Sequence, residues 1–270
     1  MKMKVTLARP WLSKTSLLLL LLVALLTTQT HQATAADREL YQLKIYHLKD
    51  KQQEDRVDAF LKDAFLPELH KLGIQRIGVF KPIGNDTAAD RRIMVLIPYK
   101  SFNQLQSVTE RLEQSPSFGS NQGYWTAAYD NPPYKRLETI QLQSFADKIQ
   151  LQAPPLKGQR AERVYELRSY ESPNEKLHLN KVQMFVKGDE VGLFKRLGFN
   201  AVFYARVMAG SHMPNLMYMT TFENQAARDE HWKTFGADPE WKKLSALPEY
   251  QHNVSKNEQM FLHPTDYSDY

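Results

Sequence analysis

Seven polar side chains of this sequence have the spacing of residues that share one face of a β-strand. Alternate residues of a strand point to the same face, and the seven are Lys44, Tyr46, Glu166, Arg168, Tyr170, Tyr204 and Arg206. Arginine offers a planar donor that can bind a carboxylate or a carbonyl oxygen, and a pocket with a few such groups would be a ligand site. The alternative is structural: Glu166 pairs with Lys44 or Arg168 and fixes the register of two packed sheets.

Other patterns that could carry chemistry are weak. The histidines are scattered, with no HExxH and no pair at the i, i+4 spacing of a zinc site. His231 and Trp232 are neighbours in an expected helix, and we interpret them as helix packing. Met213, Met217 and Met219 alternate along an expected strand, which indicates core filling rather than a redox site. The chain has no cysteine, which excludes disulfides, thiolate nucleophiles and cysteine-based zinc sites.

The elements that must position these residues occur twice along the chain. The segment Tyr41–Tyr46 corresponds to Tyr165–Tyr170, an offset of 124 residues. Ser115-Pro116 and Asp238-Pro239 then occupy equivalent places, and each combines an N-cap residue with a proline at the first helical position. A repeat of this length decides the fold prediction, because each copy must be one structural unit.

Each copy is expected to have the order β-α-β-β-α-β. In the first copy, apolar residues from Val57 to Leu72 follow the i, i+3, i+4 spacing of a helix, and Gly73 is expected to end that helix. In the second copy, Gly188 is expected to bend the equivalent helix so that Asp189 meets water. The order is that of a ferredoxin-like unit, with helices on one face of an antiparallel sheet. The predicted fold class is therefore α+β, with two tandem ferredoxin-like repeats.

The first residues of the chain have the composition of an export signal. Residues 1–35 contain four basic residues and no acidic residue, and an apolar run extends from Leu17 to Leu26. Small residues precede Ala36, where a signal peptidase is expected to cut. Ten apolar residues are too few to cross a bilayer, which takes about 20. We therefore expect an exported protein, periplasmic or secreted, without stable membrane insertion after the leader is cleaved.

The same leader accounts for most of the net charge of +5. Without residues 1–35 the chain keeps 31 lysines and arginines against 30 acidic residues. Such a balance gives no support for nucleic-acid binding, which needs a basic surface. The predicted organisation is a signal peptide over residues 1–35, a first repeat over 36–149, a linker over 150–161 that contains Pro154-Pro155, and a second repeat over 162–270.

Four stretches of the second copy resemble the NIPSNAP family. They are Tyr165-Glu-Leu-Arg-Ser-Tyr170, Leu216-Met-Tyr-Met-Thr-Thr-Phe222, Ala237-Asp-Pro-Glu-Trp241 and Phe261-Leu-His-Pro-Thr-Asp-Tyr-Ser268. The resemblance covers residues 162–268 well and the first copy, about 38–145, only in its order of elements. It implies a dimeric α+β barrel, which the two copies would here form within one chain as a pseudo-dimer. The family has no agreed reaction and supplies no catalytic residue to transfer.

A barrel of this type raises the question of which strand face points inward. Tyr41, Leu43 and Ile45 form an apolar face, which we expect to lie under the helices. The opposite strand faces would then line the barrel interior, and they carry the seven polar residues between Lys44 and Arg206. These seven are the predicted ligand-binding residues, and no catalytic or metal-binding residue is predicted.

Two functions remain open at this stage. The first is a non-catalytic binding or structural module that acts outside the cytoplasm on an unknown protein or a small hydrophobic ligand, with no cofactor. The alternative is a cofactor-free or haem-dependent monooxygenase or isomerase, by analogy with barrel relatives, although fold does not fix function. A homo-oligomer is compatible with either function, and the family's roles at mitochondria and vesicles are not carried over because the leader indicates export.

Overall fold

The computed structural model describes residues 38–145 and 151–270. The predicted signal peptide, residues 1–35, lies outside these residues. Within the described part of the chain, no helix combines the length and the apolar character needed to cross a membrane.

The first half of the chain forms one helix-covered sheet. Its elements in chain order are β1 (Leu40–Leu48), α2 (Lys51–Phe60), the π-helical segment η2 (Leu61–Phe65), α3 (Leu66–Lys71), β2 (Gly78–Pro82), η3 (Asn85–Thr87), β3 (Arg91–Tyr99), α4 (Phe102–Glu113), α5 (Pro116–Gly119) and β4 (Arg136–Ser144).

The second half repeats this order. Its elements are η4 (Arg160–Glu162), β5 (Val164–Glu171), α6 (Glu175–Val186), α7 (Glu190–Arg196), β6 (Asn200–Ala209), β7 (Asn215–Phe222), α8 (Gln225–Ala237), α9 (Pro239–Ser245), η5 (Pro248–Tyr250) and β8 (Lys256–Pro264).

The strands described here close into one barrel in the order β1-β3-β2-β8-β5-β7-β6-β4. Each half contributes four neighbouring strands, and every pairing is antiparallel. The halves join twice in a reciprocal way, through β2 with β8 and through β4 with β6. The prediction of two ferredoxin-like repeats that form an intrachain pseudo-dimeric barrel is confirmed.

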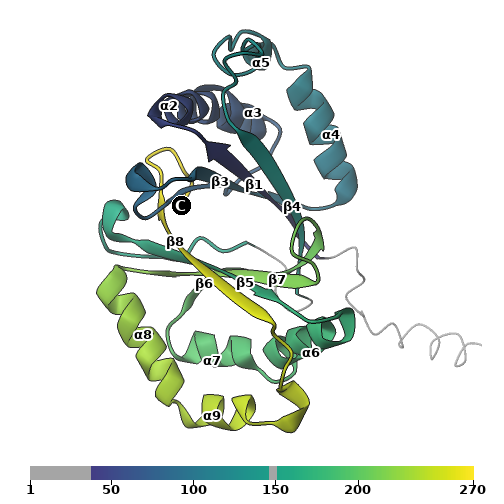
Figure 1. Cartoon of the computed structure of the whole chain (residues 1–270), viewed down its shortest axis with the longest axis vertical. Coiled ribbons are helices and arrows are strands. Elements are labelled where there is room, and N and C mark those ends of the chain that lie inside the picture. Colours follow the sequence, from purple (N-terminus) through teal and green to yellow (C-terminus); the bar gives the residue numbers. More distant parts are fainter. Residues whose placement is uncertain (1–37, 146–150) are drawn as a thin grey trace, which may run out of the picture. The chain divides into compact units, whose positions relative to one another are not determined.

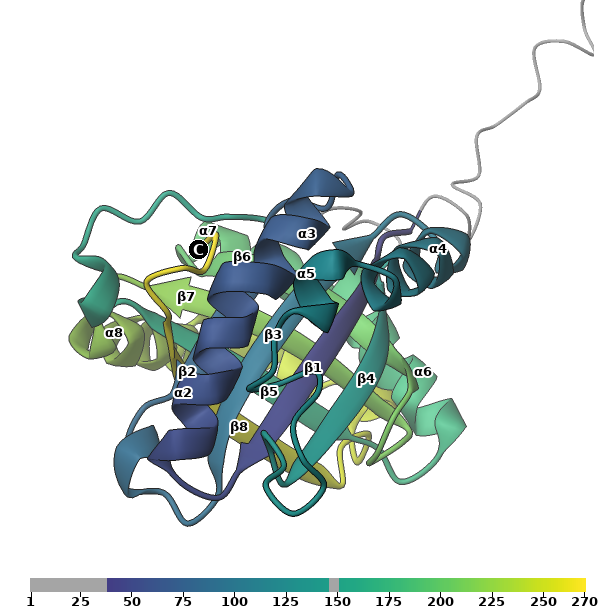
Figure 2. The ribbon, with the colours of Figure 1, turned by 90° about the horizontal axis from the view of Figure 1, so that it is seen from above.

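The helices lie on the two outer sides of this barrel, α2 to α5 on one side and α6 to α9 on the other (Figure 1). Seen from above, α2 and α3 run along the strands that they cover, and the strands of the second half cross beneath (Figure 2). The apolar side chains accordingly form three clusters, one inside the barrel and one under each helical layer.

Helix boundaries follow local sequence signals. Ser101, Asn224 and Asp238 cap α4, α8 and α9 by accepting hydrogen bonds from backbone N–H groups of the first turn. Ser115 precedes Pro116 as expected but makes no capping hydrogen bond. Gly73 follows α3 with a φ of 80°, the left-handed conformation expected of a glycine that ends a helix.

Two further local predictions can be compared with the structure. The second copy's first helix is broken between α6 and α7, and Asp189 is exposed at the break, as the sequence predicted. Met217 and Met219 are buried inside the barrel. Met213 is not core filling: it precedes β7 and is 51% exposed.

Candidate functional site

The inward and outward faces of the barrel are opposite to the sequence prediction. Tyr41, Leu43 and Ile45 lie in the interior cluster, whereas Tyr46, Tyr170 and Tyr204 lie in the clusters under the helices. The other predicted interior residues, Lys44, Glu166, Arg168 and Arg206, share those outward faces by strand alternation. The prediction that the seven polar residues line the barrel interior is therefore wrong. A closed ring of strands excludes water more completely than a layer of helices does, so the most apolar face turns inward.

Glu166 is the centre of a buried ion-pair cluster between β5 and α8. Its side chain is fully buried, and Arg168 approaches it to 2.7 Å. Arg228 on α8 donates to both carboxylate oxygens, at 2.8 and 3.0 Å. The indole nitrogen of Trp232 donates a further hydrogen bond of 2.7 Å. The carboxylate therefore has its charge and its acceptor sites satisfied by the protein itself.

Arg168 is held equally firmly. Beside Glu166 it donates to Tyr170 at 3.3 Å and to Gln259 at 3.1 Å, and its guanidinium carbon lies 3.8 Å from the centre of the Trp232 ring. The Tyr170 hydroxyl is 2.8 Å from that of Tyr218. The predicted pairing of Glu166 with Arg168 is thus confirmed, whereas Lys44 is not a partner of Glu166.

The remaining predicted residues lie apart from this cluster. Tyr204 is buried on β6, 5.8 Å from Tyr218 between ring centres. Arg206 donates to Gln143 of β4 at 2.8 Å. Lys44 and Tyr46 belong to the first half, where Tyr46 accepts a hydrogen bond of 3.2 Å from Tyr124. The sequence therefore grouped residues that the fold distributes over both helical layers.

His231 and Trp232 pack as the sequence indicated. The His231 imidazole is 2.8 Å from the Leu197 carbonyl oxygen and lies against the rings of Phe199 and Phe222. In the described residues, no three His, Asp or Glu side chains are placed so that they could hold a metal ion.

A cavity of about 540 Å³ opens at one end of the barrel, and we call it the mouth pocket. Its floor is formed by the last interior side chains of the strands: Ile45, Met94, Ile140, Leu167, Met217 and Met260. Its rim is polar and includes His47, Arg92, Glu138, Ser211, His212, Asn215, Glu258 and Gln259. An apolar cavity of this size with polar groups at its edge has the features of a small-molecule site.

The rim is ordered by ion pairs. The imidazole of His47 lies 3.1 Å from Asp90 and 3.7 Å from Glu138, and Arg92 pairs with Asp90 at 2.7 Å. Partial burial opposes ionisation of Asp90, but the hydrogen bonds from Arg92 and His47 outweigh it, and the pKa of Asp90 lies below its ordinary value. The rim thus presents both donors and acceptors in fixed positions.

The opposite end of the barrel is filled by aromatic side chains. The Tyr270 ring lies 5.8 Å from that of Phe80 and 6.2 Å from that of Tyr165. Tyr41 packs against Phe203 at 5.5 Å. The mouth pocket therefore ends in a packed core rather than in a channel.

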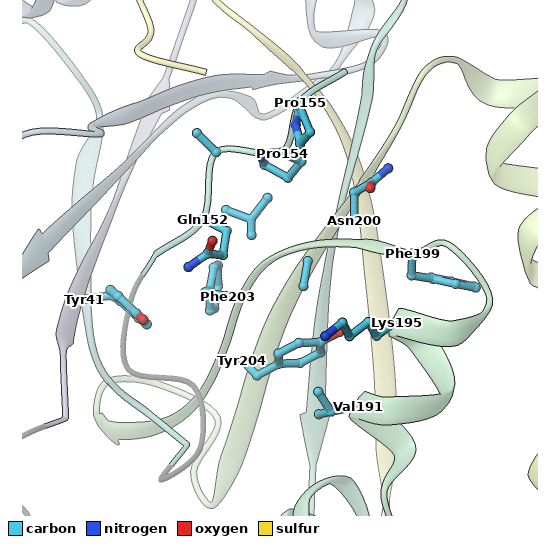
Figure 3. A pocket seen from close by; sticks show the side chains of 13 residues that line it. Tyr41, Gln152, Pro154, Pro155, Val191, Lys195, Phe199, Asn200, Phe203 and Tyr204 are labelled. Carbon is cyan, nitrogen blue, oxygen red and sulfur yellow. The ribbon is translucent and has the colours of Figure 1, made fainter. Parts of the chain in front are cut away.

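A second hollow of about 420 Å³ lies near this filled end (Figure 3). It is bounded by residues 152–155, by Lys195 of α7 and by the irregular start of β6, where the register shifts between Ala201 and Phe203.

Sequence reasoning missed the mouth pocket, although the signal was present. The alternation that predicts one face for Tyr41, Leu43 and Ile45 places His47 on the same face. In β4, the same rule connects Ile140 to Glu138. A polar residue at the end of the apolar face of a strand therefore indicates the rim of the barrel.

Comparison with known proteins supports the fold and shows a family resemblance of the second half. The sequence profile of the NIPSNAP family matches residues 165–269. No curated protein sequence matches the chain.

The solved structures that match most of the chain include three with TM-scores above 0.5. A "putative monooxygenase" from Lactobacillus acidophilus NCFM is similar with a TM-score of 0.54 and 10% identity, over 84% of this chain and 94% of that one. A protein of the same description from Fusobacterium nucleatum gives 0.56 and 8% identity, over 84% and 92%. An anthrone oxidase-like protein gives 0.51 and 9%, over 86% and 93%.

At these identities the similarity concerns the fold alone. The full-length matches agree with the observed closed barrel of two repeated halves. Residues 165–269 match the NIPSNAP family model, and they lie in the second of the two repeated halves that close the barrel.

Proposed function

We propose that this chain is a non-catalytic binding module that holds a small amphipathic molecule in the mouth pocket. The observation that carries the proposal is the cavity of about 540 Å³ with an apolar floor and a polar rim. Ligand pockets typically measure about 300–1,000 Å³ and combine apolar walls with a few placed polar groups. The ligand expected is an apolar body that fills the floor, with a hydrogen-bonding head at His47, Arg92 and Glu138.

The charged cluster around Glu166 supports a binding role over a catalytic one. A general acid or base must be able to reach its substrate. Glu166 is fully buried and bonded to Arg168, Arg228 and Trp232. We infer that this cluster holds α8 on the sheet and leaves ligand binding to the barrel.

The test is binding of the neutral apolar dye N-phenyl-1-naphthylamine, which fluoresces when it leaves water. We expect the wild type to increase its fluorescence and Met217→Gln to reduce this increase, because the substitution places an amide in the apolar floor. Met184→Gln is the matched control, since Met184 is also buried but lies under the helices. Equal dye binding by both variants would contradict the proposal.

We also propose that the protein acts outside the cytoplasm. The support is the sequence of residues 1–35, with its basic start, its apolar run and the small residues before Ala36. Mass analysis of the protein isolated from its native host should show a chain that begins at Ala36. A chain that retains residues 1–35 would refute the proposed processing.

The alternative function is a cofactor-free or haem-dependent monooxygenase or isomerase, and its support is the fold shared with the structures named above. His231, the neighbour of Trp232 in the sequence, is within hydrogen-bond distance of the Leu197 carbonyl oxygen and packs against two aromatic rings, so its ring is already engaged within the protein, unlike that of an axial haem ligand. An absorbance spectrum of protein from its native host tests the haem branch. A Soret band would favour the enzyme, and a spectrum without one favours the binding module.

A further inference from the structure

The repeat places Lys44 and Arg168 at equivalent positions in the two halves. The offset of 124 residues that relates β1 to β5 also pairs Gln42 with Glu166 and Tyr46 with Tyr170. All of these residues point toward the helices of their own half. The two halves can therefore be compared position by position.

The two halves differ at this pair of positions: the second half has an arginine with a carboxylate partner, and the first has a lysine without one. Arg168 is paired with Glu166 at 2.7 Å. In the first half the acid is replaced by the neutral Gln42, and Lys44 makes no ion pair with any residue that the structure describes. The Nζ of Lys44 lies 6.0 Å from the centre of the Phe65 ring. Burial lowers the pKa of Lys44, since nothing offsets the cost of removing its charge from water.

A cavity of about 290 Å³ adjoins Lys44, and we call it the aromatic pocket. Apart from Lys44, its walls are Leu137 and seven aromatic residues: Tyr46, Phe60, Phe65, Phe118, Tyr124, Trp125 and Tyr134. Lys44 is the only lysine, arginine or acidic residue among these lining residues. The rings are already in contact with one another: Phe60 stacks on Tyr124 at 3.7 Å, and Phe118 lies 4.9 Å from Trp125.

In the second half, side chains of α8 occupy the space beside Arg168, since Arg228 bonds to Glu166 and the Trp232 ring lies against the guanidinium. Counted from the helix caps Asn224 and Ser101, Arg228 and Trp232 of α8 correspond to Leu105 and Thr109 of α4. Neither residue supplies a charge or an indole ring. The first half thus lacks all three groups that complete the second: the carboxylate, the additional arginine and the tryptophan.

We propose that the aromatic pocket binds a small aromatic carboxylate, whose acid group pairs with Lys44 as the Glu166 side chain pairs with Arg168. Aromatic walls stabilise a planar ring by stacking. An unpaired, partly buried ammonium gains most from a ligand that brings an anion into the same dry site. This second site goes beyond the mouth pocket and does not depend on it.

The experiment is calorimetric titration of the full chain with 2-naphthoate and with 2-naphthamide, its neutral isostere. We expect the acid to bind at least about tenfold more tightly than the amide. Lys44→Met should abolish this preference and leave amide binding in place, because it removes the charge and keeps an apolar side chain. Lys100→Met is the matched control: Lys100 is an exposed lysine of the same half, so its substitution should preserve the preference.

Gln42→Glu gives an independent test that keeps Lys44. The new side chain would supply the first half with its own carboxylate two residues before the lysine, as Glu166 does for Arg168. The preference for naphthoate should then fall by about tenfold or more, and thermal unfolding checks that the variant is folded. Equal binding of acid and amide by the wild type, or an undiminished preference in Lys44→Met, would overturn the proposal.

The two proposed sites can fail separately. Met217→Gln, which alters the mouth pocket, should leave the naphthoate preference unchanged. Lys44→Met should leave binding of N-phenyl-1-naphthylamine unchanged. A naphthoate preference that Met217→Gln removes and Lys44→Met retains would assign the anion to the mouth pocket and refute the second site.

Discussion

The guanidinium of Arg168 lies over the indole of Trp232, with 3.8 Å between the guanidinium carbon and the ring centre. The same indole donates a hydrogen bond of 2.7 Å to Glu166, the partner of Arg168. Sheet and helix are thus joined by a closed triangle of contacts. Since all three side chains are largely withdrawn from water, removal of any one should lower the stability of the second half.

Trp232→Phe should lower the free energy of unfolding by about 1–3 kcal/mol, because it keeps an aromatic ring but removes one of the two hydrogen bonds to Oε2 of Glu166. Urea denaturation followed by circular dichroism measures this change. Trp125→Phe is the control, since Trp125 is 43% exposed and its indole nitrogen makes no hydrogen bond with the described residues. A loss no larger for Trp232→Phe than for Trp125→Phe would argue against a structural role of the triangle.

Glu166→Gln should be more severe, with a loss of about 3–5 kcal/mol, because the buried Arg168 and the partly buried Arg228 lose their only shared anion. The same denaturation experiment applies. Glu240→Gln removes a carboxylate from the pair with Arg196, but this glutamate is 69% exposed. It should change stability by less than about 1 kcal/mol.

Lys44→Met should stabilise the protein by about 1 kcal/mol at neutral pH, because it removes a partly buried charge that has no counter-ion. The lowered pKa of Lys44 means that the unfolded chain binds more protons than the folded one in the pH range between that lowered pKa and the ordinary value of 10.5. Wild-type stability from this group therefore rises with pH through this range, and the advantage of the variant should shrink there. Thermal melts at pH 7 and near pH 10 check the trend; a gap that widens with pH would contradict it.

Asp90→Asn should have the opposite pH dependence. The pKa of Asp90 lies below 3.8, so its ion pairs contribute above that pH and are lost as the pH falls through the lowered value. Because the Asp90 side chain is 36% exposed, we expect a loss below about 1 kcal/mol at pH 7. The difference from the wild type should disappear in acid. A difference that persists at the lowest pH at which both fold would assign the effect to something other than the charge.

Tyr270→Ala should lower the free energy of unfolding by about 3 kcal/mol, because a buried ring leaves the barrel. Tyr270→Phe is the matched control, since the Tyr270 hydroxyl is buried and has no hydrogen-bond partner among the described atoms. Its removal should be neutral or slightly stabilising. If the phenylalanine variant were as unstable as the alanine variant, the hydroxyl rather than the ring would matter.

The repeat and the order of elements could be predicted from sequence because each rests on patterns within short segments, whereas the barrel was implied by the resemblance to the NIPSNAP family. Paired segments 124 residues apart and helix ends such as Gly73 specify the two units without tertiary information. The ion pair of Glu166 with Arg168 was also accessible, since the residues are two positions apart on one strand.

The direction of the strand faces was not accessible in the same way. Alternation separates Leu43 from Lys44, but it does not say which of the two layers beyond the sheet is drier. Only closure of the barrel decides this. The partners Arg228 and Trp232 lie more than 60 residues from Glu166 in sequence, so no local pattern could have joined them to the cluster.

Fusion of the two halves changes what substitutions can achieve. In a barrel assembled from two identical chains, every substitution occurs in both halves. The spaces between sheet and helices must then both be filled or both stay open. Here β2 meets β8 and β4 meets β6 within a single polypeptide, so each half can diverge by itself. In the second half, Glu166 and Trp232 fill the space beside Arg168, whereas the first half has the aromatic pocket beside Lys44. One half can therefore stabilise the fold while substitutions in the other half change which ligand it binds.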